Sequence, residues 1–250
     1  MSIEFEHHGD GVHVVTLNRP ERLNAMDVAH KRRLAEIWRE AEQSPQVRAL
    51  VLRGAGPRAF SAGSDFKEMR ETGHNATTED LANAIPGVGV DFSKPLVAAL
   101  HGYVIGFGFT LAIHCDLRVG SPQVQMSFPE VQHGMLSAIS DVTLPGIVGE
   151  AAALEIMLTG RSYGAQEARA LRLLNDVADD PFARALELAA AMAANSMSAN
   201  RLTKQLVLAE RRERLLRHMD RIAASRADAG ASRHYAAIVA GEPGAGRARL

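Results

Sequence analysis

The sequence contains a single cysteine, Cys115, so it cannot form an internal disulfide bond. One cysteine is typical of proteins that fold in a reducing compartment. No apolar run reaches the roughly 18 residues that are needed to cross a bilayer. The first residues are mixed in polarity and charged, unlike a secretory signal peptide. These absences exclude a disulfide-stabilised secreted scaffold and a membrane-spanning protein, and they predict a soluble, cytoplasmic one.

The sequence also lacks an excess of charge of either sign. Its 28 Lys and Arg residues nearly balance its 29 Asp and Glu residues, which gives a formal net charge of −1. This balance gives no support for a nucleic-acid partner, although it leaves room for small basic patches that bind an anionic cofactor. With 250 residues, of which 46% are hydrophobic, the chain is long enough to bury a sizeable core.

The N-terminal part of the chain alternates between strand and helix patterns. A β-hairpin is expected over 3–17, where apolar residues flank a Gly-Asp-Gly turn. A helix is expected from Asp27, with Trp38 on its apolar face and Lys31 off that face. A buried strand is expected over 47–52. This order favours an α/β domain with parallel crossovers.

The stretch from Lys94 to Val131 carries the strongest functional signal. An apolar strand over 95–100 is followed by a glycine-rich turn and by an apolar helix over 109–115. Strand, glycine turn and helix is the order in which a chain directs backbone N–H groups at an anion. A second strand then leads to a lone carboxylate, Glu130, which follows Phe128 and Pro129. The arrangement indicates chemistry on a carbonyl compound.

Beyond this stretch the pattern becomes helical. Residues 70–90 are polar and are predicted to form a mobile surface loop with one helical turn. The arginine-rich run 211–214 is expected to be a solvated helix face, and the tail 241–250 is expected to be disordered. The change near residue 190 divides the chain into an α/β core, 1–190, and an all-helical region, 191–250. Helices are predicted over 150–158, 162–174, 183–197 and 200–229.

Three motifs in order resemble the signatures of the enoyl-CoA hydratase/isomerase (crotonase) superfamily. They are Asn18–Met26, Ala59–Met69, and His101–Asp116 together with Ser127–Gly134. The resemblance implies a crotonase-like α/β spiral of ββα units followed by C-terminal helices that mediate assembly into a homotrimer, or into a hexamer made of two trimers. It also implies an acyl-CoA substrate, with coenzyme A as part of the substrate thioester and no permanently bound cofactor.

The resemblance further assigns roles to residues of the second and third motifs. The backbone amides of Ser64 and Phe107 would form an oxyanion hole for a thioester enolate. Both residues lie in small-residue turns at expected helix starts, where preorganised amides can stabilise developing negative charge. Glu130 would be the general acid/base, and burial against Phe128 would raise the pKa of its carboxyl into the range that suits proton transfer.

The resemblance also implies which residues would line the substrate pocket and which would contact coenzyme A. Gly106 and Thr110 would line the substrate pocket. The resemblance implies no metal, and the spacing of the histidines at 101, 114 and 133 matches no zinc pattern. Arg22 and Lys67 would meet the phosphates of coenzyme A, and its adenine would lie near Leu23 and Phe66. The residues expected along coenzyme A are Arg22, Leu23, Ala62, Asp65, Phe66 and Lys67.

Four positions bear on which branch of the superfamily the chain resembles. Phe107 stands where the family usually has glycine, and its ring is expected to narrow the pocket. Thr110 stands where family hydratases have the first of two catalytic glutamates, so the chain resembles a one-acid member. An aspartate used by the dienoyl isomerase and dehalogenase branches would fall at Ala138. Asp141 is expected at a helix start or in solvent.

Several reactions remain open for a one-acid member. Shifting a double bond from the 3,4 to the 2,3 position needs one base that returns its proton, which suits Glu130 alone. Hydration, with or without later cleavage of an aromatic acyl-CoA, is equally open. The prediction is therefore an acyl-CoA lyase or isomerase. Its rival is a non-catalytic homologue that binds acyl-CoA or acts as a scaffold, although a pure binder needs no acid in its pocket.

Overall fold

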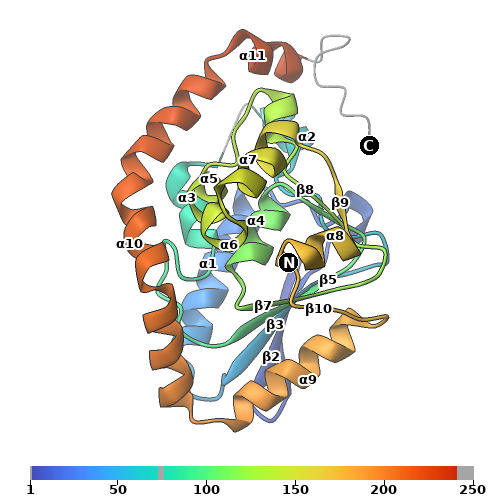
Figure 1. Cartoon of the computed structure of the whole chain (residues 1–250), viewed down its shortest axis with the longest axis vertical. Helices are drawn as coiled ribbons and strands as arrows, with labels where there is room; N and C mark the ends of the chain where they lie inside the picture. The colour runs from blue at the N-terminus through green and yellow to red at the C-terminus, as the bar shows by residue number, and fades with distance from the viewer. Residues whose placement is uncertain (1, 73–75, 241–250) are drawn as a thin grey trace.

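The computed structural model describes residues 2–72 and 76–240, which form two β-sheets with helices packed around them (Figure 1). The larger sheet has six strands in the order β1 (Ile3–Gly9), β2 (Val12–Leu17), β3 (Ala49–Gly54), β5 (Leu96–Leu100), β7 (Leu117–Gly120) and β10 (Asp176–Val177). The smaller sheet has four, in the order β4 (Ala59–Ser61), β6 (Tyr103–Ile105), β8 (Gln125–Ser127) and β9 (Tyr163–Gly164). The β1–β2 and β8–β9 pairs are antiparallel and the other pairs are parallel.

Successive strand pairs divide between the two sheets. The first strand of each of the pairs β3/β4, β5/β6 and β7/β8 lies in the larger sheet and the second in the smaller one. Helical segments follow each pair: α2 (Phe66–Thr72) and α3 (Thr78–Ala84), α4 (Phe107–His114), and η2 (Glu130–His133) with α5 (Ile139–Thr143). The chain therefore winds through repeated strand–strand–helix units, and the predicted α/β class is confirmed.

Helices cover both faces of the larger sheet. On one face, α1 (Val28–Gln43) belongs to the main core through Leu34 and Trp38, both 0% exposed. On the other face, α9 (Pro181–Ala194) packs small residues, Ala185, Ala189 and Ala193, against strand valines. Because alanine side chains let a helix approach a sheet closely, this face is filled without large residues. Figure 1 shows α9 lying below the sheet.

The interior of the molecule holds α4. All eight of its residues are buried, and the ring of Phe109 stacks on Phe128 with centroids 4.3 Å apart. The helix ends beside Asp116, whose carboxylate accepts a hydrogen bond from the Leu96 amide at 2.8 Å. Asp116 therefore has a structural role, because it fixes a backbone amide of β5. Since α4 is held on all sides, its N-terminal residue, Phe107, has a fixed position.

The C-terminal part is helical and is anchored to the core by polar contacts. The long α10 (Met197–Gly230) runs along one side of the molecule to α11 (Arg233–Ala240), which lies at its top (Figure 1). Lys204 on α10 forms an ion pair with Asp116 at 2.9 Å, and Arg226 donates to Thr78 Oγ1 at 2.7 Å. The remaining helical elements are η1 (Pro20–Arg22), α6 (Pro145–Val148), α7 (Glu150–Thr159) and α8 (Ala165–Ala170).

Two predicted segments differ from the structure. Residues 70–90 were expected to form a surface loop with one helical turn, but α2 extends to Thr72 and α3 packs against α1, with Ala82 and Ala84 buried. A capping box between Thr77 and Asp80 starts α3, which overcomes the polar composition. The single helix expected over 162–174 is replaced by β9 and the short α8, because β9 pairs with β8.

Smaller corrections concern the helix faces and ends. Lys31 lies on the buried face of α1 and is 2% exposed, so its expected place off the apolar face is wrong. The run 211–214 is only partly solvated, because Arg211 and Arg214 are half-buried. Asn195 and Ser196 separate α9 from α10, which shortens the predicted helix 183–197. The tail 241–250 lies outside the described residues. Among the described helices, none combines the length and the apolar character needed to cross a membrane.

Candidate active site

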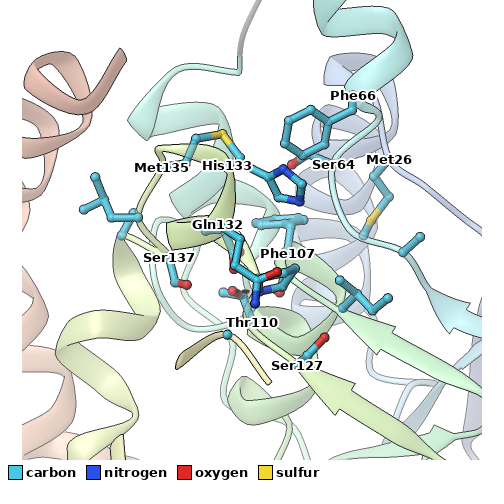
Figure 2. A pocket seen from close by; sticks show the side chains of 18 of the residues that line it. Met26, Ser64, Phe66, Phe107, Thr110, Ser127, Gln132, His133, Met135 and Ser137 are labelled. Carbon is cyan, nitrogen blue, oxygen red and sulfur yellow. Dashed lines mark hydrogen bonds between the residues drawn. The ribbon is translucent and has the colours of Figure 1, made fainter. Parts of the chain in front are cut away.

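A cavity of about 790 Å³ opens where the starts of α2 and α4 meet η2. Its wall includes most of the residues that the sequence assigns to a site, and Figure 2 shows several of their side chains converging. Arg22, Leu23 and Lys67 are absent from the described lining. The predicted residues that line the cavity are Ala62, Ser64, Asp65, Phe66, Gly106, Phe107, Thr110 and Glu130.

The turns that carry Ser64 and Phe107 touch each other. A Cβ placed on Gly63 would stand 3.0 Å from the amide nitrogen of Phe107, so only glycine fits between the two turns. Gly106 has a φ of 55°, a conformation that glycine adopts readily, and it turns the chain into α4. Phe107 is the first residue of α4, so its amide has no acceptor within the helix.

These two amides are available to a ligand. Within residues 2–72 and 76–240, neither the Ser64 amide nor the Phe107 amide donates a hydrogen bond to another protein group. Both residues line the cavity. Ser61 supports the first turn, since its hydroxyl accepts from the Gly63 amide at 3.0 Å and donates to the Asn24 carbonyl at 2.8 Å. The arrangement can hold an oxygen atom that carries negative charge.

Glu130 stands directly beside this turn. A Cβ placed on Gly106 would lie 3.1 Å from Glu130 Oε1. The other carboxylate oxygen, Oε2, is buried and has no hydrogen-bond partner among the described residues. Burial raises the pKa of Glu130 to about 7, and the charge of Asp141 adds to the rise, while its own amide and the Ser137 hydroxyl oppose it. The carboxyl therefore titrates near neutral pH, as a proton-transfer group should.

Thr110 lines the cavity beside Gly106, and Asp141 is close enough to Glu130 for its charge to act on that carboxyl. The Thr110 hydroxyl donates to the Gly106 carbonyl at 3.3 Å and lies 2.8 Å from the Ser140 hydroxyl. Asp141 lies in the first turn of α5, as predicted, but it is half-buried. Burial raises the pKa of Asp141 to about 6. Ala138, which begins this helix, has a φ of 56°, a conformation that is uncommon for any residue except glycine.

Of the residues expected along coenzyme A, Ala62, Asp65 and Phe66 line the cavity. The Leu23 carbonyl accepts a hydrogen bond from the Ala62 amide at 2.8 Å, so these two residues are adjacent. The Asp65 carboxylate is already engaged, because it accepts from Arg19 at 2.9 Å and from the first amides of α2. The Phe66 ring lies against the His133 ring, with centroids 5.4 Å apart (Figure 2). Lys67 is exposed and pairs with Glu71 at 3.6 Å.

The cavity also contains residues that the sequence reasoning missed. Lys31 is the clearest case, since its spacing from Leu34 and Trp38 by three and seven positions puts all three on one helix face. Arg226 and Tyr235 line the cavity from the C-terminal helices. No local sequence pattern predicts their place in the cavity wall. Glu68, Gln132, His133, Met135 and Ser137 also line the cavity.

The three histidines considered for a metal site have other roles. His101 donates to the Gly56 carbonyl at 2.7 Å, and His114 donates to the Thr110 carbonyl at 2.8 Å. His133 lies in the cavity beside Phe66. In the part of the chain that the structure describes, no three His, Cys, Asp or Glu side chains gather closely enough to hold a metal ion.

Comparison with known proteins identifies the family of the chain. The family model for enoyl-CoA hydratase/isomerase matches residues 7–231. An (E)-benzylidenesuccinyl-CoA hydratase from Thauera aromatica is 33% identical over 181 residues, which cover 72% of this chain and 70% of that protein. A mevalonyl-coenzyme A hydratase from Aspergillus fumigatus is 32% identical over 199 residues, which cover 77% of this chain and 73% of that protein.

A solved structure extends the comparison to the fold. An enoyl-CoA hydratase/isomerase from Mycobacterium paratuberculosis superimposes with a TM-score of 0.89 at 30% identity, covering 96% of this chain and 98% of that chain. The predicted crotonase-like fold and the predicted superfamily are therefore confirmed. With its repeated strand–strand–helix units and a family match along most of its length, the chain belongs to the enoyl-CoA hydratase/isomerase family.

Proposed function

We propose that the cavity binds an enoyl-CoA thioester and adds water across its double bond through a thioester enolate. The observation that carries this proposal is the position of Glu130, whose carboxyl lies beside the Gly106 turn. The next residue, Phe107, presents an amide that donates to no other group within the described residues. An acid/base group and an oxyanion donor thus lie next to the same turn of the cavity wall.

The enolate is stabilised by the backbone. In this mechanism the thioester oxygen accepts hydrogen bonds from the Ser64 and Phe107 amides, and these strengthen as negative charge develops on that oxygen. Such a donor lowers the activation barrier by on the order of 3 kcal/mol when it is preorganised. The buried position of α4 supports this role, because a helix held on all sides does not need to reorganise when charge appears at its N-terminus.

Glu130 moves the proton. Its carboxylate accepts a proton from water while the water oxygen forms a bond to the β-carbon and the π-electron pair moves to the thioester oxygen. Glu130 then returns the proton to the α-carbon, and the enolate collapses to the thioester. One water is added and the carboxylate is regenerated. A pKa of about 7 for Glu130 is well placed for both halves of this exchange.

A second candidate reaction is a shift of the double bond from the 3,4 to the 2,3 position. Thr110 favours it, because the position where family hydratases have a glutamate is filled by a hydroxyl that is bonded to Gly106 and Ser140. Glu130 would then take a proton from the α-carbon and return it to the γ-carbon. The names of the relatives, which are hydratases, favour hydration as the first choice.

Coenzyme A is proposed to lie along the side of the cavity formed by Ala62 and Phe66, next to Leu23. Its adenine would contact Leu23 and Phe66, and its phosphates would extend past the cavity rim toward Arg22 and Lys67. The exposure of the Lys67 side chain, at 58%, supports a role that requires access from solvent. Asp65 would act indirectly, by starting α2 and by holding Arg19.

We also propose that the chain assembles as a homotrimer, or as two paired trimers, through the region from residue 191 onward. The support is a row of apolar side chains on α10 that are exposed in the single chain. Leu206 and Val207 are 79% and 73% exposed, and Leu202 and Leu216 are also largely exposed. Burial of such side chains against another copy is favourable by about 25 cal/mol per Å² of apolar area.

The test is mass spectrometry of 2-enoyl-CoA and 3-enoyl-CoA panels, including an aromatic enoyl-CoA, after incubation with the protein in deuterated water. Hydration predicts products heavier by one deuterated water. Deuterium exchange with a shifted double bond and no added water would identify an isomerase, and cleavage of the aromatic member would identify a hydratase-lyase. Binding without turnover of any thioester would identify a non-catalytic homologue and contradict the proposal.

A matched pair of variants tests the role of Glu130. Glu130→Gln keeps the size of the side chain but removes its proton-transfer group, and it is expected to lower kcat/KM by about 10²- to 10⁴-fold. Glu150→Gln makes the same change at an exposed position of α7 that is outside the described cavity lining, and it is expected to leave kcat/KM unchanged. Full turnover by the Glu130 variant would exclude Glu130 as the acid/base residue.

A further inference from the structure

A buried amine stands in the wall of the cavity. Lys31 lies on the buried, apolar face of α1, and its side chain is only 2% exposed. It lines the cavity together with Phe107 and Glu68. Lysine is almost never this buried unless its charge has a partner. Its place at the cavity wall therefore calls for an explanation beyond packing.

The hydrogen bonds of this amine are incomplete. An ammonium group has three N–H donors, and Lys31 Nζ uses one of them on the Met26 carbonyl at 2.8 Å. Among the described residues, no carboxylate oxygen lies within 4.0 Å of Nζ. Its other recorded neighbour is the Phe107 ring, whose centroid is 5.2 Å away. The remaining donors have no described protein acceptor.

The surrounding charges do not replace an ion pair. Asp27, Glu68 and Asp80 attract the ammonium from a distance and Arg226 repels it, while burial, the largest effect, lowers the pKa of Lys31 to about 8. Asp27 is engaged by His30 at 2.6 Å, and Asp80 is engaged by Arg32 at 3.0 Å. Arg226 is held by Thr78 and by the Ala76 carbonyl. Lys31 is therefore still a cation at neutral pH, and it is incompletely compensated.

We propose that Lys31 binds an oxygen atom, with a carboxylate as the strongest ligand, on the acyl chain beyond the thioester. This inference rests on the proposed acyl-CoA function and narrows the substrate to an oxygenated acyl group. The position of Lys31 supports it, because the ring over which Nζ lies belongs to Phe107, the residue whose amide is the proposed oxyanion donor. An acyl chain that leaves the thioester on this side of the cavity comes within reach of the ammonium.

A second lysine provides a matched control. Lys94 is also buried, at 3% exposure, and its Nζ also donates to a main-chain carbonyl, that of Ser44. Lys94 is absent from the described lining of the cavity. The two residues thus share burial and hydrogen-bond type and differ in access to a ligand, so any effect on substrate choice that is specific to Lys31 comes from the cavity.

The experiment compares two substrates that differ in one carboxylate, crotonyl-CoA and glutaconyl-CoA, with the wild-type chain and the variants Lys31→Met and Lys94→Met. For the wild type we expect a higher kcat/KM with glutaconyl-CoA. Lys31→Met is expected to lower kcat/KM for glutaconyl-CoA by about 10- to 100-fold, the effect of losing a hydrogen bond to a charged group. Its kcat/KM for crotonyl-CoA should change by less than about threefold, and Lys94→Met should leave the ratio of the two unchanged.

A melting experiment gives a readout that is independent of turnover. Replacing an incompletely compensated buried cation by an apolar side chain of similar length is often neutral or stabilising. The melting temperature of Lys31→Met is therefore expected to equal or exceed that of the wild type. A lower melting temperature together with an unchanged substrate ratio would mean that Lys31 is structural, and it would overturn the inference.

The outcomes also separate this inference from the function on which it rests. If the wild type turns over crotonyl-CoA at least as well as glutaconyl-CoA, and Lys31→Met does not alter the ratio, the inference fails and the proposed acyl-CoA chemistry stands. If the wild type neither binds nor converts either thioester, the proposed function fails, and the inference fails with it.

Discussion

At the scale of single residues, the balance between the two forms of Glu130 decides what the cavity can do. A carboxyl in water is almost fully ionised at neutral pH, and an ionised group returns a proton poorly. Burial of the Glu130 carboxyl raises its pKa to about 7, which makes its acid and base forms similar in free energy. Its neighbour Asp141 pushes the pKa in the same direction, so a residue that is absent from the described cavity lining takes part in setting the protonation of the site.

The first prediction concerns this pair. Glu130 must be ionised to accept the first proton, so kcat/KM should fall as pH drops below about 7, approaching tenfold per pH unit. Asp141→Asn removes a negative charge that raises the pKa of Glu130, so the acid limb of the profile should move to lower pH. The measurement is kcat/KM between pH 5 and 9 for the wild type and for the variants Asp141→Asn and Asp220→Asn. Asp220 lies at an exposed position of α10, so its variant is the control for the loss of a negative charge. An acid limb that stays in place, or moves to higher pH, would contradict the assignment.

Residue-level prediction from the sequence succeeded where a motif fixes a backbone position and was wrong where burial depends on tertiary packing. Gly106 and Phe107 follow β6 directly, and Glu130 begins η2 just after β8. Because β6 and β8 pair in parallel with Ile105 opposite Ser127, the residues that follow the two strands lie close together. Lys31 was predicted off the apolar face because charged residues usually are. Its helical spacing from Trp38 favoured the buried face, and the structure has it there.

At the scale of elements, α4 is the part of the fold on which the site depends, and it contains a buried titratable group. His114, the last residue of the helix, is 1% exposed and donates to the Thr110 carbonyl. Burial lowers the pKa of His114 to about 3, and the nearby Arg211 and Arg118 contribute to the decrease. The folded protein therefore keeps this imidazole neutral in mildly acidic solution.

The second prediction follows from the sign of that shift. Below its ordinary pKa of 6.5 the unfolded chain binds a proton at His114 that the folded chain does not bind. The free energy of unfolding should therefore fall as pH decreases from about 6.5 toward 3, by up to about 1.4 kcal/mol per pH unit from this residue. His114→Asn keeps a donor for the Thr110 carbonyl and removes the titration. Urea unfolding at several pH values should give a shallower acid slope for the variant; parallel slopes would contradict the prediction.

The helix α10 is attached to the core by charges more than by apolar contacts. The buried side chains described along its length are Leu215 and Ile222, whereas Lys204 pairs with Asp116 and donates to the Lys94 carbonyl at 2.7 Å. The two charged side chains of this pair are 11% and 20% exposed, so little water screens them. A pair of this kind is sensitive to the loss of one partner, because the other charge stays partly buried.

The third prediction uses a control on the same helix. Lys204→Met is expected to lower the free energy of unfolding by about 2 kcal/mol, since it leaves the Asp116 carboxylate without its cation. Arg217→Met removes one partner of the exposed pair with Glu213, whose side chains are 65% and 69% exposed, and should change stability by less than about 0.5 kcal/mol. Equal effects of the two variants in chemical unfolding would show that the Asp116 contact contributes no more than a surface pair.

Elements were predictable from the sequence in proportion to how strongly their own residues specify them. The strands over 47–52 and 95–100 are continuous apolar runs, and both are buried strands in the structure. α3 was predicted only as one helical turn in a surface loop, because a capping box and two buried alanines outweigh a polar composition. The region 162–174 was predicted as one helix because the strand that pairs with its start, β8, lies far earlier in the chain, with Met126 opposite Tyr163, and the local sequence pattern does not reveal that pairing.

At the scale of the whole molecule, the cavity is completed by residues from distant parts of the chain. Its reactive part comes from the turns around Ser64, Gly106 and Glu130, which the motifs predicted. Another part of its wall comes from Arg226 and Tyr235, near the end of the described chain. Their contribution depends on where α10 leads the chain, so the reactive groups could be predicted and the shape of the acyl pocket could not.

The same helix presents apolar side chains that the single chain leaves in solvent. Leu206 is 79% exposed and Val207 is 73% exposed, and an exposed apolar patch of this kind usually marks an interaction surface. A second copy of the chain is the occupant proposed above. The fourth prediction is that the protein has about three or six times the chain mass of 26.9 kDa in solution, as measured by light scattering after size exclusion.

The variant Leu206→Glu places a charge in that surface and should shift the mass toward that of one chain, because burying an unpaired carboxylate at an interface is unfavourable. A wild-type mass of one chain would contradict the assembly directly. If the wild type is a trimer and Leu206→Glu remains one, the assembly stands but uses another surface. Since α10 also supplies Arg226 to the cavity, a variant that separates the copies and lowers turnover together would connect assembly to the shape of the site.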